Sequence, residues 1–232
     1  MNSGPVVVVT GAASGIGAAT AELFRARGWR TAGIDLRPSP TDLPIECDVT
    51  DTAGMRAAVA RVAADLGGVD AAVTAAGYYE EGIDVTEISR DRWDRMLGVI
   101  LGGTVNTCAA VLPYLIERDS GSIVAISSEL ALAGSATDLH YVAAKGAVLG
   151  LVKSLAAEVA ATGVRVNAVA PGPTDTPLLA AGSIWRGADY LKTLPLGRLV
   201  RPEEIAAAVW YLATEGVMYC GEVLSPNAGA VI

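Results

Sequence analysis

The sequence has few cysteines and a single histidine, and this scarcity excludes several kinds of site. Cys47, Cys108 and Cys220 are odd in number and far apart, so they fit neither a disulfide framework nor a metal site. We expect three small buried hydrophobic side chains and no bound metal. His140, the only histidine, cannot build a catalytic triad without a reactive serine at suitable geometry. We expect it at a helix start on the edge of a pocket.

Positive charge and long apolar runs are also scarce. A net charge of -8 without any basic run leaves no electrostatic footprint for nucleic acid. The apolar residues come in short runs broken by Gly and charge, none near the roughly 18 that span a bilayer. Residues 1–9 lack the pattern of a signal peptide. We therefore expect a soluble, cytoplasmic protein that binds a small molecule, without nucleic acid or membrane partners.

The order of patterns predicts one α/β domain over residues 1–232. A chain of this length is long enough for one large domain and short for two. β-type runs alternate with helical patterns, which is typical of a Rossmann-type doubly wound parallel sheet, here of about seven strands. The expected strands are Val6–Val9, Arg30–Ile34, Pro44–Cys47, Ala71–Thr74, Ser122–Ser127, Arg165–Ala168 and Glu222–Leu224. The expected helices are Ile16–Arg27, Thr52–Leu66, Arg92–Cys108, Tyr141–Ala161 and Glu203–Thr214.

One irregular stretch, residues 171–195, is rich in Pro and Gly. A connection that long in a compact domain is usually functional and often a lid, so we expect it to cover substrate and cofactor. Trp185 in this stretch could line an apolar pocket with Tyr78, Tyr79, Leu132 and Leu178, although core packing is the alternative.

A glycine-rich turn follows the first expected strand. Gly11, Gly15 and Gly17 have the spacing G-x-x-x-G-x-G, a variant of the dinucleotide fingerprint that lets the backbone approach a pyrophosphate at a helix N-terminus. Such a turn alone is often only a turn, but the flanking strand and helix favour a bound dinucleotide. Ser14 can add a hydroxyl donor to the phosphates.

Asp35 ends the second expected strand, where a carboxylate can accept hydrogen bonds from the adenosine ribose. A 2′-phosphate there would be repelled by about 4 kcal/mol per charge pair at about 4 Å. We therefore expect NAD rather than NADP. Arg37 is the counter-argument, because a guanidinium can neutralise a phosphate, but beside Pro38 we expect it to point to solvent. A turn residue without a ligand is the other interpretation of Asp35.

The strongest chemical signal is Tyr141-Val-Ala-Ala-Lys145 with Ser128 upstream. Residues four apart on a helix project from one face. A phenol has a pKa of about 10, and a neighbouring ammonium lowers that pKa toward the working range. Tyr141 is therefore a candidate proton donor and acceptor. A Tyr and a Lys that merely share a solvated face are the alternative, which Ser128 and the glycine motif weaken.

On these motifs the chain resembles the classical short-chain dehydrogenase/reductase family over essentially its whole length. The matching motifs are Thr10–Gly17, Asp48-Val49, Ser128, Tyr141-x-x-x-Lys145 and Pro171-Gly172 with Thr176. The resemblance implies that Ser128 polarises the substrate oxygen, Tyr141 transfers the proton, and Lys145 acidifies Tyr141 and holds the nicotinamide ribose. Thr174 and Thr176 would contact the carboxamide.

The resemblance also implies a nicotinamide cofactor, which from Asp35 we expect to be NAD, carrying the hydride while the protein supplies position and charge. Family members are commonly tetramers, so we expect a homo-oligomer, a homotetramer or a dimer, paired through helices 92–108 and 141–161. The expected cofactor-binding residues are Gly11, Ser14, Gly15, Ile16, Gly17, Asp35, Leu36, Asp48, Val49, Ala75, Ala76, Gly77, Tyr141, Lys145, Pro171, Gly172, Thr174 and Thr176.

Two positions depart from the family pattern. Ile100 stands where the family has an Asn that supports a helix distortion and a proton-relay water beside the lysine. Thr74-Ala75-Ala76-Gly77 replaces the family's N-N-A-G, so an amide that ties central strands together is missing. We expect another relay route, through Thr74 or bulk water, or slower chemistry. General acid–base catalysis is worth about 10² to 10⁴ in rate, so impairment need not mean inactivity.

These observations predict an oxidoreductase that transfers a hydride between NAD(H) and a small, largely apolar or cyclic secondary alcohol or ketone. A 3-oxoacyl-carrier-protein reductase is the alternative within the class, weakened by Asp35. An NAD-binding protein with impaired catalysis, acting as a sensor or assembly partner, is the alternative of another class. Ile100 and Thr74 support it and the intact catalytic residues oppose it. The exact substrate stays open because fold does not fix function.

Overall fold

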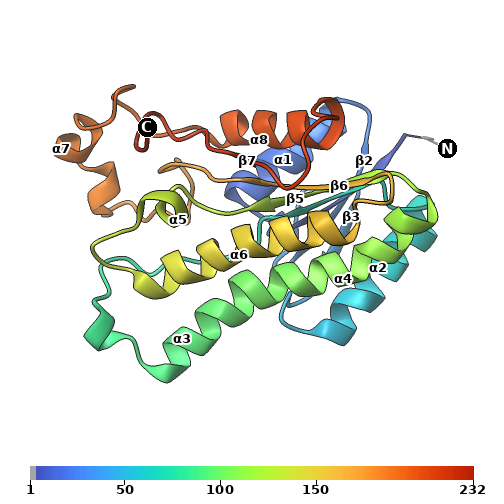
Figure 1. Ribbon diagram of the computed structural model, residues 1–232, viewed down its shortest axis with the longest axis horizontal. Coiled ribbons are helices and arrows are strands. Elements are labelled where there is room, and N and C mark those ends of the chain that lie inside the picture. The colour runs from blue at the N-terminus through green and yellow to red at the C-terminus, as the bar shows by residue number, and fades with distance from the viewer. Residues whose placement is uncertain (1–3) are drawn as a thin grey trace.

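The central feature of the structure is a parallel sheet of seven strands with helices on both faces (Figure 1). The computed structural model describes residues 4–232. The strand order is β3-β2-β1-β4-β5-β6-β7 and every pairing is parallel. The strands are β1 (Val6–Thr10), β2 (Arg30–Asp35), β3 (Leu43–Glu46), β4 (Ala71–Thr74), β5 (Gly121–Ile126), β6 (Val164–Val169) and β7 (Val223–Leu224). The predicted fold class is confirmed, with strand ends within two residues of expectation.

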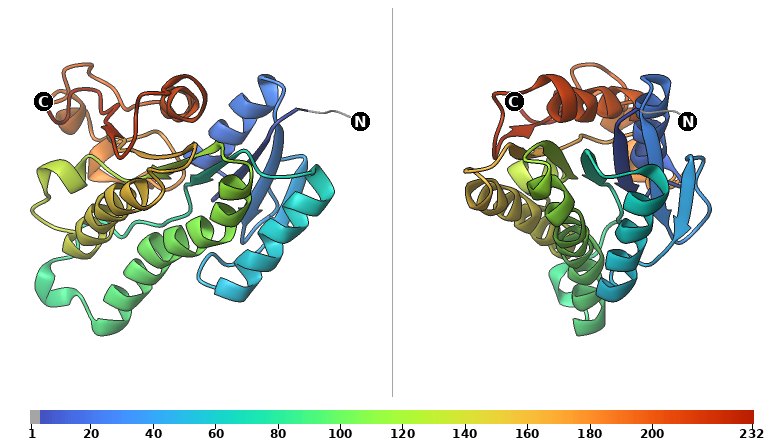
Figure 2. Two further views of the ribbon diagram at one scale, coloured as in Figure 1. Left: turned by 45° about the vertical axis from the view of Figure 1, so that its right-hand side comes forward. Right: turned by 90° about the vertical axis from the view of Figure 1, so that its right-hand side faces the viewer.

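Two layers of helices bury the sheet. Helices α1 (Gly15–Ala26) and α8 (Pro202–Trp210) pack together on one face, while α2 (Thr52–Leu66), α4 (Gly103–Glu117) and α6 (Leu139–Glu158) cover the other (Figures 1 and 2). All five residues of β1 are buried, as expected for a central strand covered on both faces. The run Val6–Val9 therefore lies in the middle of the core.

The third expected helix is longer and less regular than the sequence indicates. Helix α3 (Arg90–Leu97) passes through a π-helical turn, η2 (Gly98–Gly102), directly into α4. The resulting continuous helix ends at Glu117 rather than at Cys108. Pro113 lies inside α4, although proline removes a backbone donor. The fully buried Val111 and Leu115 on either side of it anchor the helix against the sheet, and this packing outweighs the local cost.

The same continuous helix, Arg90–Glu117, has the length and apolar composition of a membrane span, with a mean hydropathy of 1.7 in its most apolar window. Core helices of globular proteins share both properties, so this is weak evidence for a membrane. Here 44% of that window is buried, and the continuous helix packs against α2, α6 and β4.

The sequence patterns did not predict several short elements. Residues 171–195 contain a 3-10 turn, η3 (Ile184–Arg186), and a one-turn helix, α7 (Ala188–Leu191). The other short elements are η1 (Val85–Glu87), α5 (Leu130–Ala133) and a π-helical turn, η4 (Tyr211–Glu215), that ends the last predicted helix. Helices α5 and α7 lie near one another beyond the carboxyl ends of the strands, on the left of Figure 1.

The cysteine prediction is only partly right. Cys108 is buried, but Cys47 is half-buried and Cys220 is exposed. Cys220 comes just before the short edge strand β7, where the neighbouring residues give little cover.

The topology positions the site. The chain winds from β1 to β2 and β3 on one side and returns to β4 on the other side of β1. In open parallel sheets, the crevice at such a switch point, beyond the carboxyl ends of the strands, is the usual ligand site.

Candidate active site

One cavity of about 910 Å³ lies at this switch point, within the size range of ligand pockets. Every predicted catalytic and cofactor-binding residue lines it, from Gly11 to Thr176. The structure thus brings together motifs that are far apart in the sequence. Trp185, Tyr78, Tyr79 and Leu178 also line the cavity, as expected.

Two pocket predictions are wrong. Leu132 is not part of the cavity wall and is 48% exposed, because α5 turns it outward. His140 is fully buried rather than at the pocket edge, and its Nε2 lies 3.2 Å from Glu80 Oε2. The histidine therefore belongs to the packing beneath the site.

The glycine turn leaves an open space at the start of α1. Gly11 has a φ of +68°, and a Cβ there would lie 2.8 Å from the backbone of Ala75. A Cβ on Gly17 would collide with the carbonyl of Gly11. No side chain caps the N-terminus of α1, so its first N–H groups can meet an anion. These residues fit the pyrophosphate of a dinucleotide.

Asp35 lies at the far end of the same cavity. Its Oδ2 accepts from the Ala13 N–H at 3.0 Å, and its Oδ1 accepts from the Arg37 N–H at 3.1 Å. A carboxylate has about four acceptor sites, so capacity remains for ribose hydroxyls. The Arg37 side chain is 69% exposed, but its Nη2 donates to Ser14 Oγ at 3.2 Å. The sequence analysis expected Arg37 to point to solvent. Instead, its guanidinium reaches across the cavity mouth to Ser14.

The three predicted catalytic side chains converge between β5 and α6. Ser128 follows the end of β5, while Tyr141 and Lys145 lie one turn apart on α6 and are 8% and 6% exposed. Lys145 Nζ donates to the carbonyl of Ile126 at 2.8 Å, and Ser127 Oγ donates to the carbonyl of Lys145 at 2.9 Å. These bonds fix the helix against the strand that carries the serine.

The expected effect of Lys145 on Tyr141 is not what the structure shows. Burial raises the pKa of the Tyr141 phenol and the Glu129 carboxyl adds to the rise, while Ser128 acts in the opposite direction. The ammonium of Lys145 points to a backbone carbonyl and lies 5.8 Å from the centre of the Tyr141 ring. Burial lowers the pKa of Lys145 to about 8. At neutral pH, the site therefore holds a neutral phenol beside a mostly charged lysine.

The position of the missing family amide is filled by a different arrangement. Ile100 is 1% exposed and sits in the π-helical turn η2, so this helix distortion forms without an Asn. Thr104 Oγ1 donates to the Ile100 carbonyl at 2.7 Å, and Thr74 Oγ1 lies 3.4 Å from the same Thr104 oxygen. The carbonyl expected to bind a relay water thus already has a donor, and Thr74 is engaged with Thr104.

We expect Ile100→Asn to raise kcat and to shift the basic limb of the kcat/KM–pH profile, which reports the free enzyme, upward from about pH 8. Space beside Gly77 is flanked by both Ile100 Cγ1 and Lys145 Nζ, and the pKa of Lys145 is lowered by burial to about 8. An amide oxygen there stabilises the charged ammonium. Ile100→Leu is the matched apolar control. An unchanged rate and profile would show that Thr104 and Thr74 already compensate.

Glu129 is the main site residue that the sequence patterns missed. It lines the cavity, is 7% exposed, and its Oε2 accepts from Ser128 Oγ at 3.0 Å. Burial raises its pKa to about 7, although hydrogen bonds from Ser128 and the backbone act the other way. No Lys, Arg or His within residues 4–232 forms an ion pair with it. The only sequence signal is an acidic residue between serines and an apolar run.

We expect Glu129→Gln to stabilise the protein at pH 8 but much less at pH 5. The unfolded chain loses this proton near pH 4.5 and the folded chain near pH 7, so stability falls as pH rises through that window. The loss is at most about 3 kcal/mol. Urea unfolding of both proteins at the two pH values measures it, and an equal gain at both would contradict the raised pKa.

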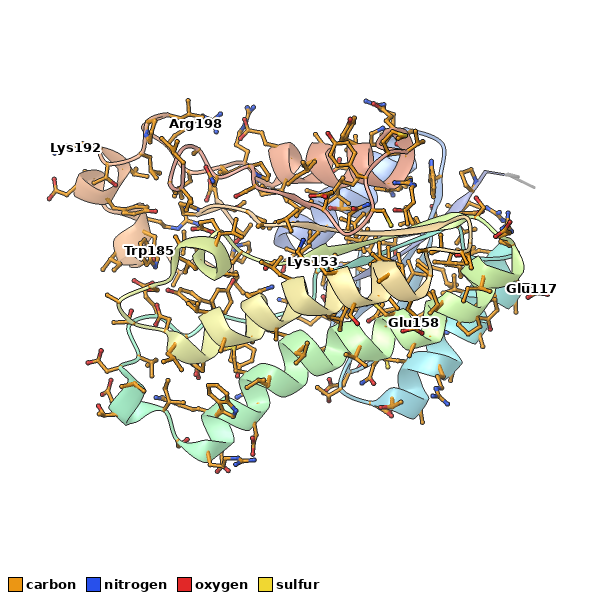
Figure 3. All side chains as sticks on the ribbon, in the orientation of Figure 1. Glu117, Lys153, Glu158, Trp185, Lys192 and Arg198 are labelled. Atoms are coloured by element: carbon orange, nitrogen blue, oxygen red, sulfur yellow. The ribbon has the colours of Figure 1, made fainter. Side chains whose placement is uncertain are left out.

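The segment 171–195 is tied to the catalytic centre through Tyr79. Trp185 Nε1 donates to Tyr79 Oη at 3.1 Å, and this hydroxyl donates to Asp138 Oδ2 at 2.7 Å. The Tyr79 ring packs edge-on against the Tyr141 ring, with centroids 4.9 Å apart. Figure 3 shows Trp185 on the segment that carries α7, at the end of the molecule opposite Glu117. The segment's position is therefore coupled to the catalytic tyrosine.

The chain is similar in sequence and structure to known dehydrogenases and reductases. A family model described as enoyl-(acyl carrier protein) reductase matches residues 11–230. A cis-4-hydroxycyclohexanecarboxylate dehydrogenase from Sinomonas cyclohexanicum is 38% identical, covering 97% of this chain and 95% of the relative. A 3-oxoacyl-acyl-carrier-protein reductase from Thermotoga maritima is 34% identical, covering 99% and 98%. The ligand-free aldohexose dehydrogenase of Thermoplasma acidophilum matches with a TM-score of 0.91 and 32% identity, covering 97% and 93%.

Proposed function

Because this chain belongs to the short-chain dehydrogenase/reductase family, we propose that it transfers a hydride between NAD(H) and a small, cyclic or largely apolar secondary alcohol or ketone. Membership makes it an oxidoreductase acting on CH–OH groups. The observation that carries the finer proposal is the single cavity shared by Asp35, the glycine turn and the group of Ser128, Tyr141 and Lys145.

The chain's own residues have distinct tasks in this proposal. A nicotinamide cofactor, when bound, would supply or accept the hydride. The Ser128 hydroxyl orients the substrate oxygen, and the Tyr141 phenol exchanges a proton with it. Lys145, charged at neutral pH, favours the phenolate that remains after Tyr141 gives up its proton. The buried position of all three excludes bulk water from the transfer.

The substrate class rests on the outer wall of the cavity. Tyr78, Tyr79, Leu178 and Trp185 give it aromatic and aliphatic surface. A relative 38% identical to this chain is named for a cyclic alcohol, cis-4-hydroxycyclohexanecarboxylate. A ring-bearing secondary alcohol suits both observations.

A 3-oxoacyl-carrier-protein reductase is the second candidate. A relative 34% identical over nearly the whole chain carries that name, while Asp35 in the cavity opposes the 2′-phosphate of NADPH. Cytoplasmic location and a homo-oligomeric state stay predictions from the sequence.

A panel of secondary alcohols with NAD⁺ tests the proposal, followed by absorbance of the reduced cofactor. We expect turnover of cyclic secondary alcohols. Reduction of an acetoacetyl thioester with NADPH, without oxidation of any alcohol by NAD⁺, would favour the second candidate. Binding of NAD⁺ without turnover of either substrate class would favour a sensor or assembly role.

A further inference from the structure

The Ser128 hydroxyl has only one proton to donate, and its acceptor in the structure is the Glu129 carboxyl. Ser128 Oγ donates to Glu129 Oε2 at 3.0 Å and accepts from the Leu130 N–H at 3.2 Å. To polarise a substrate oxygen, Ser128 must turn this proton away from Glu129. Glu129 then loses its only side-chain donor among the described residues.

Loss of that donor is costly for Glu129 because of its surroundings. The residue is 7% exposed and has no cation partner within residues 4–232. Backbone N–H groups still act on the carboxyl, but a buried charge that loses a hydrogen-bond donor is disfavoured. A substrate that displaces the Ser128 proton is therefore favoured if it supplies a replacement donor.

Glu129 is placed to receive that donor from the substrate. Its charge raises the pKa of Tyr141 in the catalytic centre and also that of Tyr190 in the segment 171–195. Glu129 is therefore close enough to the catalytic centre and to the segment 171–195 for its charge to act on both. Tyr190 packs edge-on against Trp185, with ring centroids 4.8 Å apart, and Trp185 lines the same cavity as Glu129.

We propose that Glu129 is a specificity-determining residue whose carboxylate accepts a hydrogen bond from a second hydroxyl, on the carbon next to the reacting carbon. This inference rests on the proposed function. Glu129 Oε2 is 3.0 Å from the Ser128 Oγ that binds the reacting oxygen, so only a group close to that oxygen reaches both. The preferred substrates are vicinal diols and the corresponding hydroxy ketones.

A hydroxyl fits this position better than an ammonium group does. The Lys145 ammonium lines the same cavity and has no carboxylate within 4 Å among the described residues. A second cation nearby would be repelled, whereas a neutral donor is not. During oxidation the alcohol O–H would give its proton to the Tyr141 oxygen, once the phenol has released its own proton to solvent, and the hydrogen on the reacting carbon would leave as hydride to a bound NAD⁺. The neighbouring hydroxyl is unchanged.

The test compares kcat/KM for the vicinal cyclohexanediol with that for cyclohexanol, using NAD⁺. We expect the wild type to prefer the diol, and Glu129→Leu to lower this preference roughly tenfold to a hundredfold. Glu129→Gln keeps an acceptor oxygen and should give an intermediate preference, even if Glu129→Leu folds poorly. Glu117→Gln is the matched control, because Glu117 is exposed at the end of the molecule opposite Trp185 (Figure 3).

The outcomes separate the two proposals. An equal loss with both alcohols in Glu129→Leu would show that Glu129 acts only through Ser128, and an unchanged kcat/KM for each alcohol would show that Glu129 contributes to neither. Either result overturns the assignment of Glu129 while the proposed function stands. A wild type that oxidises neither alcohol, nor any other in the panel, overturns the proposed function itself.

Discussion

Tyr141→Phe is expected to lower kcat for alcohol oxidation by about 10²- to 10⁴-fold, the usual contribution of a general acid or base. The substitution removes only the phenolic oxygen. The ring keeps its edge-on contact with Tyr79, so the segment 171–195 should stay in place. Steady-state kinetics with the best alcohol of the panel measure the effect.

Two controls make the Tyr141 result specific. NADH binding, measured by fluorescence titration, should be nearly unchanged, because Asp35 and the glycine turn are untouched. Tyr114→Phe, on α4 and away from the cavity, should retain wild-type activity. If Tyr141→Phe kept more than about a tenth of the wild-type rate, far above the range for general catalysis, another group would have to carry the proton.

NADH is expected to bind at least about a hundredfold more tightly than NADPH. The repulsion between Asp35 and a 2′-phosphate is worth about 4 kcal/mol per charge pair at about 4 Å in an effective dielectric near 20. Separate titrations with the two dinucleotides measure the ratio. In Asp35→Asn, which keeps the size of the side chain, the ratio should fall to within roughly tenfold.

Arg37 supplies the decisive comparison for the cofactor prediction. Its guanidinium donates to Ser14 Oγ and lies 3.9 Å from Asp35 Oδ1, so it is placed to hold a phosphate beside Asp35. Arg37→Ala should leave the NADH affinity close to the wild-type value. Tighter binding of NADPH than NADH by the wild type, with a selective loss of NADPH binding in Arg37→Ala, would overturn the assignment to NAD.

The sequence predicted those parts of the fold that depend on local patterns. The run Val6–Val9 marks the central strand because its residues are apolar without alternation, as in a strand buried on both faces. The helix Thr52–Leu66 has the predicted ends because Asp51 caps its start and Gly67 ends it with a φ of +77°. Such signals lie within a few residues of the boundary that they set.

The sequence failed where packing between distant segments decides the structure. The π-helical turn at Gly98–Gly102 and the continuation of α4 past Pro113 have no local signal. They follow from the fit of Met96, Val111 and Leu115 into the core, where all three are fully buried. Short elements such as α5 and α7 have too few residues to show a period.

The same limit applies to the chemistry of the site. The spacing of Tyr141 and Lys145 correctly placed both on one helix, but the direction of their pKa shifts depends on burial and on where the ammonium points. No motif marks Glu129 in the sequence, and only the folded chain shows it buried against Ser128. Motifs predicted which residues gather, and tertiary structure determined their electrostatics.

A crystal structure of the protein with NAD⁺ bound tests the central claim most directly. We expect the adenosine ribose at Asp35, the pyrophosphate at the start of α1, and the nicotinamide ring beside the Tyr141 oxygen with Lys145 Nζ on its ribose. A nicotinamide ring outside the cavity, or a Tyr141 oxygen remote from both the ring and Lys145, would contradict the proposed chemistry.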